Sequence, residues 1–163
     1  MISIVVAIAK GNNAIGFENR LLWSLPDDMK RFKELTTGHT VLMGRNTFLS
    51  LPKGALPNRR NIVITDNPDE KFAGCEMAFS IEEAVKIAGN DDEVFVMGGA
   101  SIYRQFLPLA DKLYLTFVDD SPQADTYFPE INFDEWKENI RSFHPADEKH
   151  VAAFEFLDLE RKR

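Results

Sequence analysis

The chain has 163 residues, of which 44% are hydrophobic and 28% are charged, so it is long enough to bury the core of one globular domain. Its net charge of −7 argues against a general binder of nucleic acid or of anionic membranes. The single cysteine, Cys75, rules out an intrachain disulfide and a metal cluster built from cysteines. We expect one domain over residues 1–163, no nucleic-acid partner and no bound metal.

The N-terminus, MISIVVAIAK, has too short an apolar run for a signal peptide and lacks a charged leader. No later segment is long and apolar enough to cross a bilayer, so we expect a cytoplasmic protein without a membrane partner. The histidines His39, His144 and His150 lack the spacing of metal ligands and are expected on the surface or in loops. No apolar surface stripe demands a dimer, which makes a monomer the expected state.

Short apolar segments rich in β-branched residues recur along the chain, at residues 2–9, 40–44, 61–65 and 93–99. Such segments are typical of parallel strands that are buried on both faces. Helical patterns lie between and after them, at residues 26–36, 46–51, 81–88 and 101–107. Strands that alternate with helices predict a three-layer α/β fold with a mostly parallel sheet and flanking helices.

The last third of the chain has a different pattern. Residues 111–120 and 152–160 alternate between polar and apolar side chains, which predicts antiparallel edge strands at the C-terminal side of the sheet. Two loops, at residues 10–23 and 119–129, are long and rich in turn-forming or acidic residues. Loops of this length are often binding loops or lids, although a tolerated surface excursion is the alternative for the first one.

Two adjacent aspartates begin the predicted helix in the segment LLWSLPDDMKRFKEL. At about 100° per residue, Asp28 lies between Phe32 and Leu35 on the apolar stripe. An acid there is costly unless it is hydrogen-bonded, so either a helix cap or a ligand with paired N–H donors must satisfy it. Burial would raise its pKa, which suits proton chemistry near neutrality. Asp27 faces solvent, with Arg31 as its expected partner one turn along.

Three predicted strands end in residues that suit an anion. MGRNT (43–47) offers a guanidinium, a hydroxyl and backbone N–H groups at a strand-to-helix turn, MGGAS (97–101) offers bare backbone, and a third strand ends in Thr65. In α/β sheets, ligands bind outside the carboxyl ends of strands. The three turns together favour a nucleotide with several phosphates. No G-x-G-x-x-G or P-loop signature is present, so a standard Rossmann or kinase-type site is not expected.

Adjacent arginines, Arg59 and Arg60, stand in the segment PKGALPNRRNIVIT. As surface charges they need no explanation. As a bidentate clamp, one of them could hold a substrate carboxylate.

These motifs together resemble the dihydrofolate reductase family, and the resemblance covers the whole chain. The segments that carry it, in the family's order and spacing, are ISIVVAIA, NNAIGFEN–LLWSLPDDMKRFK, VLMGRNTF, LPNRRNIVIT, EVFVMGGASIYRQFLP, KLYLT and DTYFP. The resemblance implies an eight-stranded, mostly parallel sheet. It also implies NADPH-dependent reduction of 7,8-dihydrofolate to tetrahydrofolate, for one-carbon metabolism and the synthesis of thymidylate and purines, and binding of antifolates.

The resemblance implies that Asp28 accepts hydrogen bonds from the pterin's N3–H and 2-amino group. Thr116 would hydrogen-bond this carboxylate, Trp23 would hold a nearby water, and Leu21 is placed with the catalytic residues. Arg59 would bind the α-carboxylate of the glutamate tail. The residues expected to line the pterin and benzoyl pocket are Val6, Ala7, Met29, Phe32, Leu51 and Leu56.

A second set of residues is assigned to the cofactor, namely Ala7, Ile15, Gly16, Gly44, Arg45, Asn46, Thr47, Thr65, Met97, Gly98, Gly99, Ala100, Ser101, Ile102 and Tyr103. Arg45 would bind the 2′-phosphate that distinguishes NADPH from NADH. Gly98, Gly99 and Ala100 would form the pyrophosphate turn, with a cis peptide bond between the two glycines. The chain departs from the family pattern at Asp66 and Phe79, where a serine and a basic residue are common, which predicts a weaker 2′-phosphate site.

In the implied mechanism, hydride passes from the nicotinamide C4 to C6 of the pterin, and N5 gains a proton. Asp28 cannot reach N5, so an ordered water admitted past the loop 16–22 is the expected donor, while the ionised carboxylate raises the basicity of N5. Closure of this loop, steadied by Asp125, would exclude water. Leu22 stands where the family usually has proline, which predicts a looser lid, and Ala100 replaces a common third glycine.

Two other hypotheses fit part of the pattern. A reductase of the same fold that acts on a ribosylated pyrimidine in riboflavin synthesis would need neither Asp28 on a pterin nor Arg59 on a glutamate tail. A non-catalytic nucleotide-binding module would leave the acid on the apolar stripe unexplained.

Overall fold

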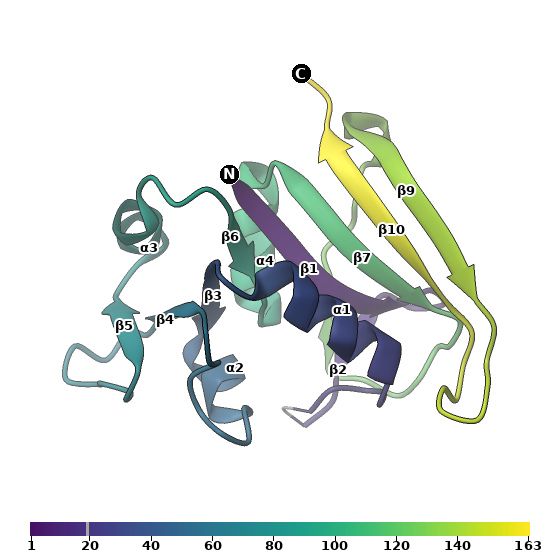
Figure 1. Ribbon diagram of the computed structural model, residues 1–163, viewed down its shortest axis with the longest axis horizontal. Helices are drawn as coiled ribbons and strands as arrows, with labels where there is room; N and C mark the ends of the chain where they lie inside the picture. The colour runs from purple at the N-terminus through teal and green to yellow at the C-terminus, as the bar shows by residue number, and fades with distance from the viewer. Residues whose placement is uncertain (19) are drawn as a thin grey trace.

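The computed structural model describes residues 1–18 and 20–163, and an eight-stranded sheet forms its centre (Figure 1). In spatial order the strands are β5 (Cys75–Ala78), β4 (Arg60–Ile64), β3 (Thr40–Gly44), β6 (Val94–Val96), β1 (Ile2–Ala9), β7 (Lys112–Val118), β10 (Phe154–Arg161) and β9 (Trp136–His144). Among the described residues, the α-helices are α1 (Pro26–Thr36), α2 (Arg45–Leu49), α3 (Ile81–Ala88) and α4 (Ala100–Phe106). None of them is both long and apolar enough to cross a membrane.

The strands from β5 to β7 pair in parallel, whereas β10 runs antiparallel to both β7 and β9. The predicted three-layer α/β fold with an antiparallel C-terminal side is therefore confirmed. The prediction that residues 111–120 and 152–160 form edge strands is wrong, because β7 lies between β1 and β10, and β10 lies between β7 and β9. The edges are β5 and β9, which the sequence pattern did not reveal.

Helices cover both faces of the sheet, and α1 crosses the near face in front of β1 while α4 lies behind (Figure 1). The alternation of side chains along β1 builds both layers. Ile4 and Val6 belong to the cluster that includes buried residues of α3 and α4. Val5, between them, packs in the cluster that contains Leu35 of α1 and Phe48 of α2. The core is thus split into two apolar layers by the sheet.

Helix α1 matches the prediction at residues 26–36, and burial of the residue that precedes it anchors its start. Pro26 takes the first helical position, where the missing N–H costs nothing. Leu25 precedes it and offers no side-chain cap. Instead, Leu25 is buried in a cluster with Val118 of β7 and Phe154 of β10, which anchors the beginning of α1 to the sheet.

A second, two-stranded sheet joins the two long loops. It pairs β2 (Ala14–Gly16) with β8 (Thr126–Tyr127) in antiparallel fashion. The strands approach so closely that a Cβ on Gly16 would lie 2.6 Å from Oγ1 of Thr126, so a larger residue there would force Thr126 to move. The loop at residues 10–23 is therefore held against the loop at residues 119–129.

Candidate active site

A large cleft lies along the carboxyl ends of β1, β3, β4 and β6, between α1 and the turns that lead into α2 and α4. All residues that were predicted for the site line this cleft, except Gly16 and Thr116. Thr116 is buried in β7 and reaches the cleft through a hydrogen bond to Asp28. The carbonyl of Gly16 accepts the backbone N–H of Asp125 at 3.1 Å, which holds Gly16 in the loop that was predicted to act as a lid.

The Asp28 carboxyl comes from the first turn of α1 and meets the sheet at β7. Thr116 is the register partner of Ala7 in β1, so both side chains point to the same face of the sheet. Its hydroxyl donates a hydrogen bond to Oδ1 of Asp28 at 2.5 Å. The half-buried Asp28 carboxyl, which was predicted from the apolar stripe of the helix, therefore lies in the cleft and is held by the Thr116 hydroxyl.

Burial raises the pKa of the Asp28 carboxyl above its ordinary value. The hydrogen bond from Thr116 and the positive charge of Arg31 lower the pKa, but burial is the larger cause. Burial raises the pKa of the Tyr103 phenol on α4, and the nearby charge of Asp28 raises it further. The Tyr103 hydroxyl donates to the carbonyl of Val5 at 2.9 Å. The site thus holds an acid whose proton is retained nearer to neutrality than that of an exposed aspartate.

Arg31 forms an ion pair with Asp158 of β10, and its guanidinium lies 4.4 Å from the centre of the Phe156 ring. The predicted pair between Arg31 and Asp27 is therefore wrong, because β10 offers both a carboxylate and an aromatic face to the guanidinium. The backbone N–H of Asp27 donates instead to Nε2 of His150 at 3.3 Å. His150 lies in a loop, as expected, but it is buried there, with 2% of its surface exposed.

Trp23 is tied to the second loop by its indole N–H, which donates to Oδ2 of Asp120 at 3.0 Å. The other oxygen of that carboxylate accepts the backbone N–H of Ser121 at 2.8 Å. In this conformation the indole N–H that was expected to hold a water is engaged by a protein carboxylate. The Trp23 ring still lines the cleft.

Gly16 and Glu18, in the loop that was predicted to act as a lid, both contact Asp125, the residue expected to steady it. Oδ2 of Asp125 accepts the backbone N–H of Glu18 at 2.9 Å, which adds to the backbone bond between Asp125 and Gly16. Leu21, which the resemblance placed with the catalytic residues, lies at the rim of the cleft and is 72% exposed.

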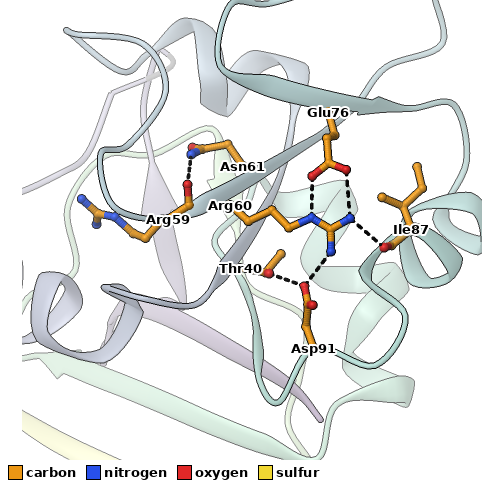
Figure 2. Close-up of polar contacts among 7 residues, drawn as sticks. All are labelled: Thr40, Arg59, Arg60, Asn61, Glu76, Ile87 and Asp91. Carbon is orange, nitrogen blue, oxygen red and sulfur yellow. Dashed lines mark hydrogen bonds and ion pairs between the residues drawn. The ribbon is translucent and has the colours of Figure 1, made fainter.

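Arg59 and Arg60 have different environments although they are adjacent (Figure 2). The guanidinium of Arg60 pairs with Glu76 and Asp91 and donates to the carbonyl of Ile87 at 2.9 Å. The guanidinium of Arg59 points away from this cluster in Figure 2 and lines the cleft. Its Nη1 donates to the Thr36 hydroxyl at 3.1 Å, which fixes its position. Of the two arginines, Arg59 is the one available to a ligand in the cleft.

In the turn after β6, backbone atoms of glycine residues line the cleft. The peptide bond between Gly98 and Gly99 is cis, as expected, and Gly98 has a φ of 120°. The Gly98 carbonyl accepts the N–H of Gly44 at 2.8 Å, so the turns after β3 and β6 are joined. A Cβ on Gly98 would lie 3.4 Å from Oγ1 of Thr47 and from the ring of Tyr103. The absence of a side chain at Gly98 keeps this part of the cleft open to a ligand.

Arg45, the first residue of α2, is bound by a carboxylate that the sequence pattern did not single out. Its Nε lies 2.8 Å and 3.0 Å from the two carboxylate oxygens of Glu70. Glu70 also accepts the Thr65 hydroxyl at 2.6 Å. The bond from Thr65, followed by that from Arg45, holds the pKa of Glu70 below its usual range. Arg45 and Thr65, which were both predicted to bind phosphate, therefore both bind the carboxylate of Glu70.

The family model of dihydrofolate reductase matches residues 1–161 of the chain. The chain belongs to the dihydrofolate reductase family. It is 42% identical over 163 residues to a type 3 dihydrofolate reductase of Salmonella typhimurium, with 100% of this chain and 99% of that protein covered. It is 41% identical over 162 residues to the dihydrofolate reductase of Bacillus subtilis (strain 168), with coverages of 99% and 95%.

A solved structure agrees with this family assignment. Dihydrofolate reductase from Enterococcus faecalis, complexed with NADP(H) and RAB-propyl, superposes with a TM-score of 0.92 at 33% identity, and the match covers 100% of this chain and 97% of that one. As a member of the dihydrofolate reductase family, the protein is an oxidoreductase that reduces dihydrofolate with NADPH. The family, the activity and the cofactor expected from the resemblance are confirmed, and the pyrimidine reductase hypothesis is not favoured.

Three partners of residues in or beside the dihydrofolate reductase site were missed from the sequence: Asp120, Glu70 and His150. Asp120 and Glu70 lie in acidic stretches, DDSPQ and NPDEK, where several carboxylates are equally plausible partners. His150 is 123 positions away from Asp27, to which it binds. No local pattern marks any of the three, because their partners are brought near only by the tertiary fold.

Proposed function

We propose that Asp28 binds the pterin of 7,8-dihydrofolate through its N3–H and 2-amino group, and that this contact orients C6 and N5 for reduction. The proposal is supported by the half-buried Asp28 carboxyl, held at 2.5 Å by Thr116 inside the cleft. A planar heterocycle with two adjacent N–H donors matches the two oxygens of a carboxylate. Binding such a ligand also offsets the cost of keeping the acid out of water.

The remaining walls of the cleft suit the rest of the substrate. The apolar residues proposed to contact the pterin and benzoyl groups are Val6, Ala7, Met29, Phe32, Leu51 and Leu56, all of which line the cleft. Arg59 is proposed to bind the α-carboxylate of the glutamate tail. Its guanidinium is already fixed by the Thr36 hydroxyl and by the carbonyl of Pro57, so little side-chain freedom is lost on binding.

The other end of the cleft fits NADPH, because the glycine turn leaves space beside Thr47 and Tyr103 that a Cβ would fill. When bound, NADPH supplies the hydride that C6 of the pterin accepts. The residues proposed to hold it are Ala7, Ile15, Gly16, Gly44, Arg45, Asn46, Thr47, Thr65, Met97, Gly98, Gly99, Ala100, Ser101, Ile102 and Tyr103. Within this set, Arg45 is proposed to bind the 2′-phosphate.

The proton for N5 is proposed to come from a water that enters at the rim of the cleft, where Leu21 and Trp23 lie. Asp28 contacts the opposite edge of the pterin, and its negative charge raises the basicity of N5. The lid, held by Asp125 at Gly16 and Glu18, excludes other water from the two aligned rings.

The test of this function is a spectrophotometric assay with purified protein, NADPH and 7,8-dihydrofolate. We expect loss of the NADPH absorbance to require dihydrofolate and to be far slower in an Asp28→Asn variant. A ribosylated aminopyrimidine serves as the alternative substrate. Oxidation of NADPH with the pyrimidine but not with dihydrofolate would overturn the proposal.

We further propose that the protein works as a single-domain, cytoplasmic monomer and that antifolates with paired N–H donors compete at Asp28. The edge strand β9 supports the monomer, because the exposed charges of Lys137, Glu138 and Arg141 oppose pairing of this edge with another copy. Light scattering after size-exclusion chromatography measures the oligomeric state.

A further inference from the structure

The helix that carries Asp28 begins without a cap of its own. The first backbone N–H groups of a helix have no partner inside the helix, and a Ser, Thr, Asp or Asn at the preceding position usually accepts one of them. Here that position is Leu25, which cannot accept a hydrogen bond. Pro26 has no N–H, so the first N–H that needs a partner belongs to Asp27.

The missing acceptor comes from the opposite end of the chain. Nε2 of His150 accepts the Asp27 N–H at 3.3 Å. His150 belongs to the loop 145–153 between β9 and β10, and only 2% of its surface is exposed. A buried polar ring whose nitrogen meets the free N–H of a helix start performs the role of a cap.

The orientation of the His150 ring is fixed by Asp147. Oδ1 of Asp147 lies 2.8 Å from Nδ1 of His150, and a carboxylate oxygen can only accept, so Nδ1 carries the proton and Nε2 keeps its lone pair for Asp27. The same Oδ1 accepts the backbone N–H groups of Lys149 and His150 at 2.8 Å and 2.9 Å. The ring also packs on Phe154, with 5.0 Å between the ring centres. These contacts lie within the loop and with Phe154, so they hold the acceptor nitrogen in place independently of α1.

We propose that His150 is a positioning residue for Asp28: by accepting the N–H of Asp27, it fixes the first turn of α1 and thereby holds the neighbouring carboxyl against Thr116. Asp28 follows Asp27 directly in that turn, and its hydrogen bond to Thr116 depends on where the turn lies. Without the acceptor, the turn loosens and the carboxyl moves toward water. This inference rests on the proposed role of Asp28 as the acid that binds the pterin.

Two substitutions at His150 distinguish the roles of its two ring nitrogen atoms. In His150→Gln, the amide oxygen can take the position of Nε2 and accept the Asp27 N–H. In His150→Asn, the shorter amide reaches only the position of Nδ1 and loses Asp27. The readouts are kcat/KM for dihydrofolate, the Kd for NADPH, and the pH midpoint of the Asp28 carboxyl followed by carbon-13 NMR in the ligand-free enzyme.

We expect His150→Asn to lower kcat/KM for dihydrofolate about tenfold, chiefly through KM, while the Kd for NADPH changes less than twofold. The Asp28 midpoint should move to lower pH, because burial is the largest influence on its pKa and a loosened turn admits water. Arg31 and Tyr103, the charged or titratable groups that act on or respond to Asp28, are unchanged in the variant. His150→Gln should stay within about twofold of wild type in all three readouts.

Equal behaviour of the Gln and Asn variants, or an Asp28 midpoint that stays at its wild-type position in His150→Asn, would overturn the inference. If His150→Asn does not fold, Asp147→Ala takes its place, because Asp147 is exposed and its loss frees the ring to rotate. A wild-type midpoint in Asp147→Ala would then refute the role of the ring. Normal turnover by Asp28→Asn would instead refute the proposed function, so the two failures are distinguishable.

Discussion

The Thr116 hydroxyl on β7 donates a hydrogen bond of 2.5 Å to the Asp28 carboxylate on α1. This bond joins the middle of the sheet to the first turn of the helix that covers it. It also opposes the effect of burial, since burial raises the pKa of Asp28 and a bond to the charged form lowers it. The balance between the two determines at which pH the active-site acid is ionised.

Replacement of Thr116 by valine should raise the pKa of Asp28, because the opposing hydrogen bond is lost while burial remains. Carbon-13 NMR titration of the Asp28 carboxyl in the ligand-free enzyme measures this shift. Thr116→Ser keeps the hydroxyl and serves as the matched control, with a midpoint close to that of wild type. A midpoint that moves to lower pH in the valine variant would contradict the assigned direction.

Asp28→Asn should reduce kcat at pH 7 by roughly 10²-fold or more, the scale associated with removal of one preorganised electrostatic contact. The amide retains the shape and an acceptor for Thr116 but cannot raise the basicity of N5. Turnover should recover partly in acid, where the substrate arrives already protonated. The pH–rate profiles of the two enzymes test this, and parallel profiles would show that the charge of Asp28 has no part in protonation.

The same substitution should stabilise the folded protein at neutral pH. The pKa of Asp28 is raised from 3.8 in the folded state, so the folded protein binds this proton more tightly than the unfolded chain does. The free energy of unfolding therefore declines as pH rises from the unfolded to the folded pKa of Asp28. Asn removes this penalty, so Tm at pH 7 should rise by about 2–4 °C for each kcal/mol gained in the free energy of unfolding. The gain should vanish below pH 3.8. Calorimetry at both pH values decides the sign.

Arg59→Leu should weaken folate binding by roughly 10-fold or more, on the scale of a hydrogen bond to a charged group, with little change in Tm or in NADPH affinity. Arg60→Leu provides a matched control at the next position, because Arg60 binds Glu76 and Asp91 instead of facing the cleft. That variant should lose Tm and keep its affinity for folate. Fluorescence titration with folate and thermal melts measure both quantities. Similar losses of folate affinity in the two variants would show that Arg59 has no special role.

Glu70→Gln should increase the affinity for NADPH severalfold and leave the affinity for NADH unchanged. Glu70 accepts the Nε–H of Arg45, so its negative charge opposes a 2′-phosphate at the same guanidinium. Arg45→Leu should have the opposite effect on NADPH, again without a change for NADH. Kd values for the two cofactors in each variant provide the measurement, and equal shifts for NADPH and NADH in Glu70→Gln would rule out competition at the 2′-phosphate.

The elements with strong local patterns could be predicted from the sequence. The apolar runs of β1 and β3 and the helical periodicity of α1 and α3 coincide with their predicted ranges. Strand β9 could not be found, because most of its residues are exposed and its sequence, WKENIRSFH, has no alternating apolar face. Strands β2 and β8 contain three and two residues; they exist because two loops meet, which no local pattern records.

The site divides in the same way. Asp28 could be located because an acid on an apolar stripe is a local conflict, and Arg59, Arg45 and Gly98 follow from recognisable motifs. The charges that restrain them could not be located. Asp158 holds Arg31 from a strand at the far end of the chain. The sequence therefore identified groups that line the cleft, while the partners that orient these groups depend on distances set by the completed fold.

The insertion of β10 between β7 and β9 has a consequence for biosynthesis. The strand that carries Thr116 emerges from the ribosome well before β10, its neighbour on one side, because β10 ends at Arg161. Until residues 154–161 have been translated, β7 presents an open backbone edge that other chains can pair with. The sheet around Thr116 is therefore completed only after β10 has been made, and nascent chains that lack β10 carry an exposed strand edge that favours aggregation.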